Sequence, residues 1–366
     1  MKNTLIATNY SSEYVARMRK LSDNTSLAAL DAEGVHQDTV SKAAIELSKA
    51  ADRAERRATR RASEPEPRVA TLPAHAPLDQ VRTARRRQAV KRGSDTYLPS
   101  WSDIAVGLPS ALLRSALFSC SQKIQAASFS EAVEDQRPLV ANWEIPSLSN
   151  LSITLSGYEL CQFDRKVYAT CLDYYRDKPL PPEDSPLYTT TSFYEFIHRM
   201  NHSYGLTSHF AVRASLLRLS FAQLRLQFKG WNIEVPRLIN VSFEDGAITG
   251  AYKASDILLL RVTDSVANLF GPGDWTAVEK EVVGYDGLKG WIANFYAGHS
   301  KPHWLAVDSL RKNSGYASRP SNFKKSLYTA LDSLKNEETP LSCRVKKYEQ
   351  SEDGANILVV RSAWKE

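Results

Sequence analysis

Near its C-terminal end the chain contains the stretch Ser318-Arg-Pro-Ser-Asn-Phe-Lys-Lys-Ser-Leu-Tyr-Thr-Ala-Leu-Asp-Ser-Leu334. Its apolar residues recur every three or four positions, which predicts a helix with one face against a hydrophobic core. Small, polar and basic side chains occupy the rest of its surface, as a helix that enters a DNA groove requires. Long cations can reach phosphates or guanine edges, and Asn can contact adenine. The residues expected to contact DNA from this helix are Arg319, Ser321, Asn322, Lys324, Lys325 and Tyr328.

The segments around this helix predict a winged-helix order. Their patterns follow one another as helix, short strand, helix, turn, helix and β-hairpin, the arrangement that places the third helix in the DNA major groove. Lys346 and Lys347 lie on the hairpin, so we expect them to contact the flanking DNA backbone as a wing. The expected elements are residues 286–299, 303–306, 308–313, 318–336, 342–349 and 356–362.

The same order is predicted earlier in the chain. Ser192 and Glu195 form a capping-box pattern that starts the second helix, and Ser208 is a candidate cap for the third. The third helix carries a stripe of small and basic residues, but it is apolar nearly all round, so a buried structural helix is the alternative to a DNA-reading one. The elements are expected at residues 158–178, 187–190, 192–205, 209–226, 233–236, 238–243, 247–252 and 257–262. The candidate DNA contacts are Ser208, His209, Arg213, Ser215, Arg218 and Arg225.

These patterns predict an α+β fold made of two tandem winged-helix domains, preceded by a basic N-terminal segment that is partly disordered and partly helical. The length of 366 residues suits two domains with additional segments. Hydrophobic residues make up 43% and charged residues 24%, which is typical of a soluble globular protein. The predicted limits are residues 1–97 for the basic segment, 98–275 for the first domain with an N-terminal extension, and 276–366 for the second.

The composition also disfavours several other kinds of protein. The longest apolar runs are only a few residues, so no membrane span is expected. Residues Met1 to Tyr10 lack a signal pattern, and we therefore expect the protein in the cytoplasm. The four cysteines include no C-x-x-C pair, which disfavours a zinc site, and a reducing compartment disfavours a disulfide scaffold. We expect neither a metal nor a cofactor.

The net charge of +6 is concentrated in the N-terminal segment. Residues 1–99 hold 18 Lys and Arg against 12 Asp and Glu, whereas residues 100–366 hold 29 of each. Two basic clusters, within residues 53–61 and 82–92, supply most of the excess, and such clusters attract phosphate backbones. A solvated basic helix without a specific target is the alternative. Helices are expected over residues 37–63 and 78–92, on either side of a proline-rich linker.

The sequence lacks the common catalytic motifs. It contains no G-x-x-x-x-G-K-[ST] phosphate loop, no H-E-x-x-H metal motif and no nucleophile elbow. His198 and His202 stand four residues apart, as a metal pair on a helix would, but no carboxylate or thiol accompanies them in the sequence. Sixteen tyrosines leave open a tyrosine nucleophile that nicks DNA. We predict that the protein is not an enzyme.

Five runs of the sequence suggest a family. They are Leu108-Pro-Ser-Ala-Leu-Leu-Arg-Ser-Ala-Leu-Phe118, Tyr158-Glu-Leu-Cys-Gln-Phe-Asp-Arg-Lys-Val-Tyr168, Leu288-Lys-Gly-Trp-Ile-Ala-Asn-Phe-Tyr-Ala-Gly-His299, Asp308-Ser-Leu-Arg311 and Asn322-Phe-Lys-Lys-Ser-Leu-Tyr-Thr-Ala-Leu-Asp-Ser-Leu334. Together they resemble the TrfA family of bacterial plasmid replication initiators over about residues 98–364.

The resemblance implies tandem winged-helix domains that bind directly repeated origin sites (iterons) in double-stranded DNA. Initiators of this kind open the adjacent AT-rich DNA and recruit host DnaA, the DnaB helicase and the sliding clamp. Their activity depends on a balance between monomer and homodimer, which links them to plasmid copy control. Some carry a Gln-x-x-Leu-Phe-type clamp peptide; here Leu117 and Phe118 are the candidates, with Arg114 at the Gln position. The alternative is that Leu117 and Phe118 pack in the core.

The leading hypothesis is an iteron-binding plasmid replication initiator. Two DNA-binding modules on one linker make the second docking effectively intramolecular, which raises affinity without a new contact. The alternative is a winged-helix transcriptional repressor with the same domains and no role in replication. A third class is a DNA-nicking enzyme.

Overall fold

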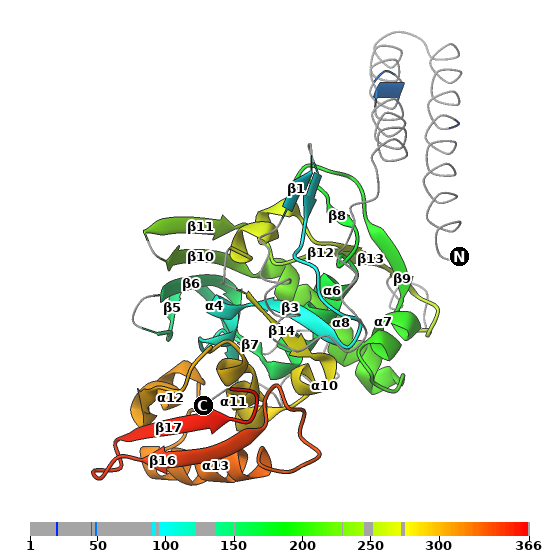
Figure 1. Cartoon of the computed structure of the whole chain (residues 1–366). Helices are drawn as coiled ribbons and strands as arrows, with labels where there is room; N and C mark the ends of the chain where they lie inside the picture. The colour runs from blue at the N-terminus through cyan, green and yellow to red at the C-terminus, as the bar shows by residue number, and fades with distance from the viewer. Residues whose placement is uncertain are drawn as a thin grey trace. The chain divides into compact units, whose positions relative to one another are not determined.

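The computed structural model describes residues 90–92, 95–121, 137–148, 151–228, 230–244, 252–271 and 275–364, together with Lys20, Ile45, Ser48 and Lys49 (Figure 1). The chain divides into two compact units, Met1–Ala76 and Pro77–Glu366. Of the predicted helix over residues 37–63, only Ile45, Ser48 and Lys49 are described, and nearly all of the two basic clusters lie outside the described residues. Among the described helices, none combines the length and the apolar character that a bilayer crossing needs. The predicted domain limits at residues 97 and 275 stay predictions.

The unit Pro77–Glu366 is a mixed α+β structure in which one order of elements occurs twice. The first occurrence, called here the first repeat, consists of α6 (Gln162–Asp173), β9 (Thr189–Ser192), α7 (Phe193–Arg199), α8 (Leu206–Phe221), β12 (Asn240–Phe243) and β13 (Ile257–Arg261). Its strands form a sheet in the order β12-β13-β9. The predicted capping box is confirmed, because the backbone N–H of Glu195 donates to Ser192 Oγ at 3.1 Å at the start of α7.

The second occurrence, the second repeat, lies at the C-terminal end. It consists of α11 (Gly287–Ala297), β15 (Trp304–Ala306), α12 (Val307–Asn313), α13 (Pro320–Ser333), β16 (Val345–Gln350) and β17 (Asn356–Arg361). Its strands form a sheet in the order β15-β17-β16. In each repeat the short first strand therefore pairs antiparallel with the second strand of the later pair, β9 with β13 and β15 with β17. The two repeats share their pairing as well as their order.

The first repeat also contains a sheet that the sequence analysis did not predict. Four antiparallel strands in the order β11-β10-β6-β5 make it up: β5 (Leu139–Ile145), β6 (Leu151–Tyr158), β10 (Gln223–Phe228) and β11 (Trp231–Val235). The prediction of a helix to residue 226 was wrong, because α8 ends at Phe221 and β10 follows. Leu224 and Leu226 are buried while Arg225 is exposed, and this alternation has the period of a strand.

Shorter elements complete the unit. The predicted helix over 78–92 was wrong at its end, because residues 90–92 form a strand that pairs with the next one. These elements are β1 (Val90–Arg92), β2 (Asp95–Tyr97), β3 (Ala105–Pro109), α4 (Ser110–Leu113), β4 (Phe118–Ser119), β7 (Leu160–Cys161), β8 (Pro179–Leu180), the 3-10 helix η1 (Asp264–Leu269), β14 (Trp275–Glu279) and α10 (Lys280–Val283). The pairing of β3 with β14 brings the segment before the first repeat beside the segment that leads into the second.

Backbone and side-chain hydrogen bonds join the two repeats through residues 114–121. The indole N–H of Trp291, in α11, donates to the carbonyl oxygen of Ser115 at 3.1 Å. The backbone N–H of Cys120 donates to the carbonyl oxygen of Ser314 at 2.9 Å. The buried apolar residues of both repeats belong to one continuous core. The expectation of two modules on a linker is therefore corrected to two repeats with a packed junction.

Arg165 of α6 is the charged residue at the centre of this junction. Its side chain is among the largest fully buried ones, and burial lowers its pKa to about 10. Nη2 donates to the carbonyl oxygens of Val283 at 3.1 Å and Tyr285 at 2.9 Å, and Nη1 donates to that of Gly290 at 3.4 Å. A Cβ atom on Gly290 would lie 2.1 Å from the Tyr285 oxygen, so only glycine allows this approach. One guanidinium thus binds three carbonyl groups of the backbone segment that runs from the end of α10 into α11 and so enters the second repeat.

Replacement of Arg165 with Met is expected to destabilise the folded unit by about 3 kcal/mol, because three carbonyl oxygens, two of them in buried contacts, lose their charged donor. Urea unfolding followed by circular dichroism measures this change. Lys335→Ala is the matched control, since it removes an exposed cation from an ion pair with Asp332, for which about 0.5 kcal/mol or less is expected. Equal urea midpoints for the two variants would contradict the role of Arg165.

Candidate nucleic-acid interface

Helix α13 of the second repeat has the two faces that its sequence predicts. Phe323, Leu327 and Leu331 are fully buried, and the helix packs against α11. Proline at the first helical position, Pro320, suits the start of a helix because its missing N–H has no intrahelical partner there. Four of the residues predicted to contact DNA are exposed on the other face or at its N-terminal end: Arg319, Ser321, Asn322 and Lys325.

The N-terminal end of α13 combines three groups that can bind DNA. The first backbone N–H groups of a helix have no intrahelical partner and carry a partial positive charge, which attracts phosphate. Arg319 stands at the N-cap position, and Lys325 lies six residues further along on the exposed face. Within the described part of the chain, neither cationic head has an ion-pair or hydrogen-bond partner, so both remain available to a phosphate or a base edge. Asn322 lies between them with an exposed amide.

Lys324 and Tyr328 differ from these four residues because both are half-buried against the β16–β17 hairpin. Lys324 Nζ donates to the carbonyl oxygen of Gly354 at 3.2 Å. The ring of Tyr328 stacks on that of Tyr348, with centroids 5.7 Å apart and planes 11° apart. The sequence predicts that Lys324 and Tyr328 contact DNA, whereas in the structure both contact the hairpin.

The hairpin itself carries charges of both signs. Lys346 and Lys347 are exposed on β16, as predicted, and Lys347 Nζ is paired with Glu349 at 2.9 Å. An exposed pair of this kind contributes little to stability, so Lys347 can exchange its partner for a phosphate. The turn beyond them is acidic, with Glu352 and Asp353 exposed.

The third helix of the first repeat, α8, is mostly buried, which is the alternative that the sequence analysis left open. His209, Ser215 and Arg218 are almost completely buried and are removed from the candidate interface. The ring of His209 stacks on Phe193, with centroids 3.9 Å apart. Exposed positions of α8 are largely apolar, including Leu206, Leu217 and Phe221.

Asp164 of α6 explains why Arg218 and Ser215 turn inward. Arg218 Nη2 lies 2.8 Å and Arg137 Nη1 2.7 Å from its two carboxylate oxygens, and Ser215 Oγ donates at 2.7 Å. Burial alone would raise the pKa of Asp164. The two guanidinium groups and the hydrogen bonds outweigh that effect and hold the pKa well below its ordinary value. The cluster is an internal support of the first repeat.

The other predicted contacts of the first repeat do not share one exposed face. Gly205 is the N-cap of α8, and the Ser208 hydroxyl donates instead to the carbonyl oxygens of Ser203 at 2.9 Å and Gly205 at 3.2 Å. Arg213 is half-buried over the ring of Phe243, with 4.8 Å from its Cζ to the centroid. Arg225 lies on β10 and is paired with Glu234 at 3.3 Å. Ser208 and Arg213 are partly buried on α8 and Arg225 lies on β10, so the three residues do not form an exposed stripe.

Leu117 and Phe118 are also buried, so the prediction that they form an accessible clamp peptide is corrected. Their exposed fractions are 1% and 2%. Phe118 lies in β4, which pairs parallel with β7, and its ring is 6.2 Å from that of Tyr168. The alternative of core packing describes both residues.

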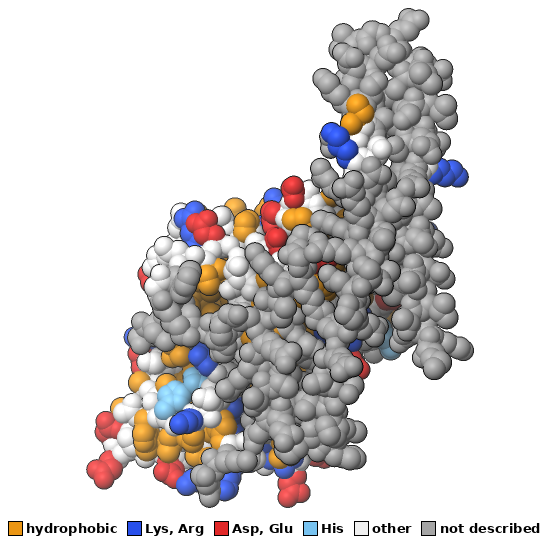
Figure 2. All heavy atoms as spheres, turned by 45° about the horizontal axis from the view of Figure 1, so that its top comes forward, with side chains coloured by type: hydrophobic (Ala, Val, Ile, Leu, Met, Phe, Trp, Pro, Cys, Tyr) orange, Lys and Arg blue, Asp and Glu red, His pale blue; other side chains and the backbone are white. Residues whose placement is uncertain are grey.

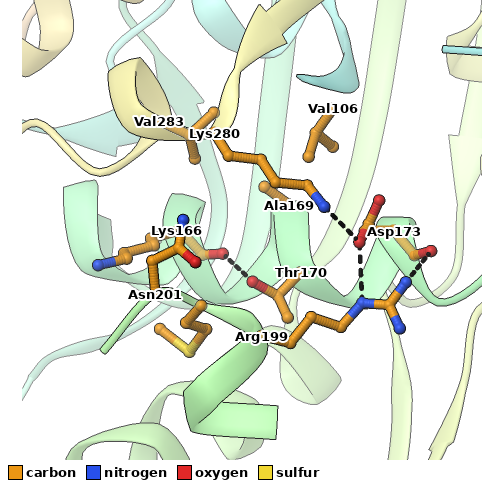
Figure 3. A pocket seen from close by; sticks show the side chains of 10 residues that line it. Val106, Lys166, Ala169, Thr170, Asp173, Arg199, Asn201, Lys280 and Val283 are labelled. Carbon is orange, nitrogen blue, oxygen red and sulfur yellow. Dashed lines mark hydrogen bonds and ion pairs between the residues drawn. The ribbon is translucent and has the colours of Figure 1, made fainter. Parts of the chain in front are cut away.

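Sequence reasoning missed an ion cluster between α6, α7 and α10 (Figure 3). Asp173 Oδ2 accepts from Arg199 Nε at 2.8 Å and from Lys280 Nζ at 2.9 Å, beside a small pocket. Burial raises the pKa of Asp173, but the two cations outweigh it and lower the pKa overall. Figure 3 shows the Lys166 side chain directed away from this carboxylate. The partners lie 26 and 107 residues from Asp173, so no local pattern signals them.

Within the described ranges, no group of three or more His, Cys, Asp or Glu is placed to hold a metal ion. His198 instead stacks on Tyr194, with centroids 6.0 Å apart.

The exposed charges on the face seen in Figure 2 are of both signs and are interspersed. Of the predicted site residues, the structure therefore brings together those at the N-terminal end of α13, with the hairpin beside them.

No protein-family model matches the chain, and no curated protein matches it significantly. Among solved structures, it is similar to two crystal structures of domains 2 and 3 of RctB. The first, from selenomethionine derivatives, gives a TM-score of 0.42 at 10% sequence identity and covers 70% of this chain and 99% of that one. The second gives 0.39 at 9% identity and covers 64% and 95%.

Arg218→Met is expected to lower the melting temperature by roughly 5–10 °C, because Asp164 would remain buried with one of its two cations missing. Differential scanning calorimetry measures the shift. Arg225→Ala is the matched control: the sequence assigns both arginines to the same helix, but Arg225 is exposed, and a shift of about 1 °C or less is expected. A similar shift in both variants would contradict the inward role of Arg218.

Proposed function

We propose that the protein is a plasmid replication initiator that binds repeated sites in double-stranded DNA through α13. The observation that carries the proposal is the exposed N-terminal end of this helix, where Arg319, Asn322 and Lys325 lie together above a buried apolar face. The order of elements around it supports assignment to the winged-helix class, in which the third helix enters the major groove. The resemblance of five sequence runs to TrfA-type initiators supports the role in replication.

The two repeats have different tasks in this proposal. The second repeat reads DNA, whereas the buried α8 and the Asp164 cluster make the first repeat a rigid support. Binding would combine a salt-dependent phosphate contribution from Arg319 and Lys325 with base-edge contacts, each worth about 1–3 kcal/mol of discrimination. Origin opening would draw on contacts that form only with bent or strand-separated DNA. Recruitment of DnaA, the DnaB helicase and the sliding clamp, and a balance between monomer and homodimer, are included on the resemblance alone.

Replacement of Arg319 and Lys325 with Ala is expected to weaken DNA binding and to flatten its salt dependence. Each lost phosphate contact reduces the slope of log K against log salt concentration by about 0.9. Fluorescence anisotropy with a labelled duplex at several salt concentrations measures the slope. Arg225→Ala serves as the control, because it removes a cation outside the proposed interface. An unchanged slope in the double variant would count against α13.

A plasmid that carries this gene and its upstream DNA as the sole replication functions is expected to replicate in a suitable host. Transformation followed by counting of plasmid copies measures this outcome. The alternative, a transcriptional repressor, would bind the same DNA without supporting replication. We propose no enzymatic step; nicking of a supercoiled plasmid in the presence of magnesium would contradict this part of the proposal.

A further inference from the structure

Lys324 and Lys325 are neighbours in the sequence, but the structure gives them different surroundings. Lys325 is exposed on the outer face of α13. Lys324 is half-buried, and its ammonium group donates to the carbonyl oxygen of Gly354 at 3.2 Å. Hydrogen bonds from a charged donor are stronger than neutral ones, so this contact holds the ammonium group at the hairpin.

The turn that receives Lys324 has a defined backbone. Gly354 has φ +63°, a left-handed conformation that glycine adopts readily, and its N–H donates to the carbonyl oxygen of Ser351 at 2.8 Å. Asp353 Oδ1 accepts from the N–H of Ala355 at 3.0 Å. A Cβ atom on Gly354 would lie 2.7 Å from Lys324 Nζ. The turn therefore accommodates the lysine head at a position that a side chain would occupy.

The charge of the turn gives this contact a second effect. Glu352 and Asp353 are exposed, and an acidic turn beside DNA repels phosphate. The hydrogen bonds from the Ser351 hydroxyl and the Ala355 N–H lower the pKa of Asp353 most, and the charge of Lys324 makes the smallest lowering contribution. Lys324 thus offsets negative charge at the same place where it fixes the backbone.

A second contact connects the hairpin to α13 further from the turn. Tyr328 stacks on Tyr348, and the Tyr348 hydroxyl donates to Asp332 Oδ1 at 3.0 Å. The hairpin is therefore attached to the helix at two places, near its turn by Lys324 and along β16 by the tyrosine pair.

We propose that Lys324 is a positioning residue that attaches the 351–356 turn to α13 and so fixes the wing relative to the DNA-reading face, whereas Lys325 contacts phosphate. This inference rests on the proposed function. It assigns the two adjacent lysines different effects: loss of Lys325 removes a phosphate contact, and loss of Lys324 frees the turn of the wing while the tyrosine pair still holds β16.

The test compares Lys324→Met and Lys325→Met in the full chain, with Lys312→Met as a charge-matched control on α12, where Lys312 pairs with exposed Asp308. Two measurements are made: the salt dependence of binding to a labelled mixed-sequence duplex, and amide hydrogen exchange over residues 351–356. Lys325→Met is expected to reduce the salt slope by about 0.9 and to leave the exchange unchanged. Lys324→Met is expected to change the slope much less than Lys325→Met does, because its charge offsets only the acidic turn. It is expected to weaken binding about tenfold and to speed exchange of the turn amides about tenfold or more.

An equal loss of slope in the two lysine variants, with unchanged exchange in Lys324→Met, would overturn the positioning role. The two proposals fail separately. If the wild-type chain does not bind the duplex, the proposed function fails, and the exchange measurement still decides whether Lys324 holds the turn. If the wild-type chain binds the duplex but exchange of the turn is the same in Lys324→Met and Lys312→Met, only the role of Lys324 fails.

Discussion

The arrangement of the two repeats depends on the buried guanidinium of Arg165. A charge in the interior is costly unless its hydrogen-bonding capacity is used, and here three carbonyl groups after β14 receive it. Those carbonyls lie between the end of α10 and the middle of α11, so one side chain of the first repeat fixes the entry into the second. The absence of a side chain on Gly290 lets the backbone close around it. The sequence hypothesis of two modules on one linker had no means of including such a contact.

Helix α6 has a central position because adjacent residues on it serve opposite neighbours. Asp164 binds Arg218 of α8 and Arg137, which precedes β5, while Arg165 binds the segment around α10 and α11. The carboxylate of Asp164 therefore binds its partners inside the first repeat. The guanidinium of Arg165 binds its partners at the junction between the first repeat and the second. Asp173, at the other end of the same helix, is buried and binds Arg199 and Lys280, which are partly exposed, so it repeats this bridging. Much of the charged interior of the unit is organised along twelve residues.

Helix α13 could be predicted from the sequence because its apolar and polar residues fall on separate faces. Helix α8 could not, because its polar residues Ser215 and Arg218 have their partner, Asp164, more than fifty residues away. A basic residue at helical spacing looks the same in a sequence whether it faces solvent or a buried carboxylate. The strand β10 was missed for a related reason: leucines at 224 and 226 continue the apolar pattern of the preceding helix, and the partner strand β6 lies far back in the sequence. Local pattern thus recovered the order of most elements and the two faces of α13, and failed where a distant partner decides.

The packed junction has a consequence for how the chain responds to cleavage or truncation. Trp291, Ile292 and Phe295 of α11 are buried in the same core as Leu112 and Leu117. A fragment that ends before residue 286, or begins after it, would present these aromatic and aliphatic surfaces to water, and large exposed apolar patches favour aggregation. Expression of either repeat by itself is thus a route to insoluble material, and the pair is expected to melt as a single cooperative body.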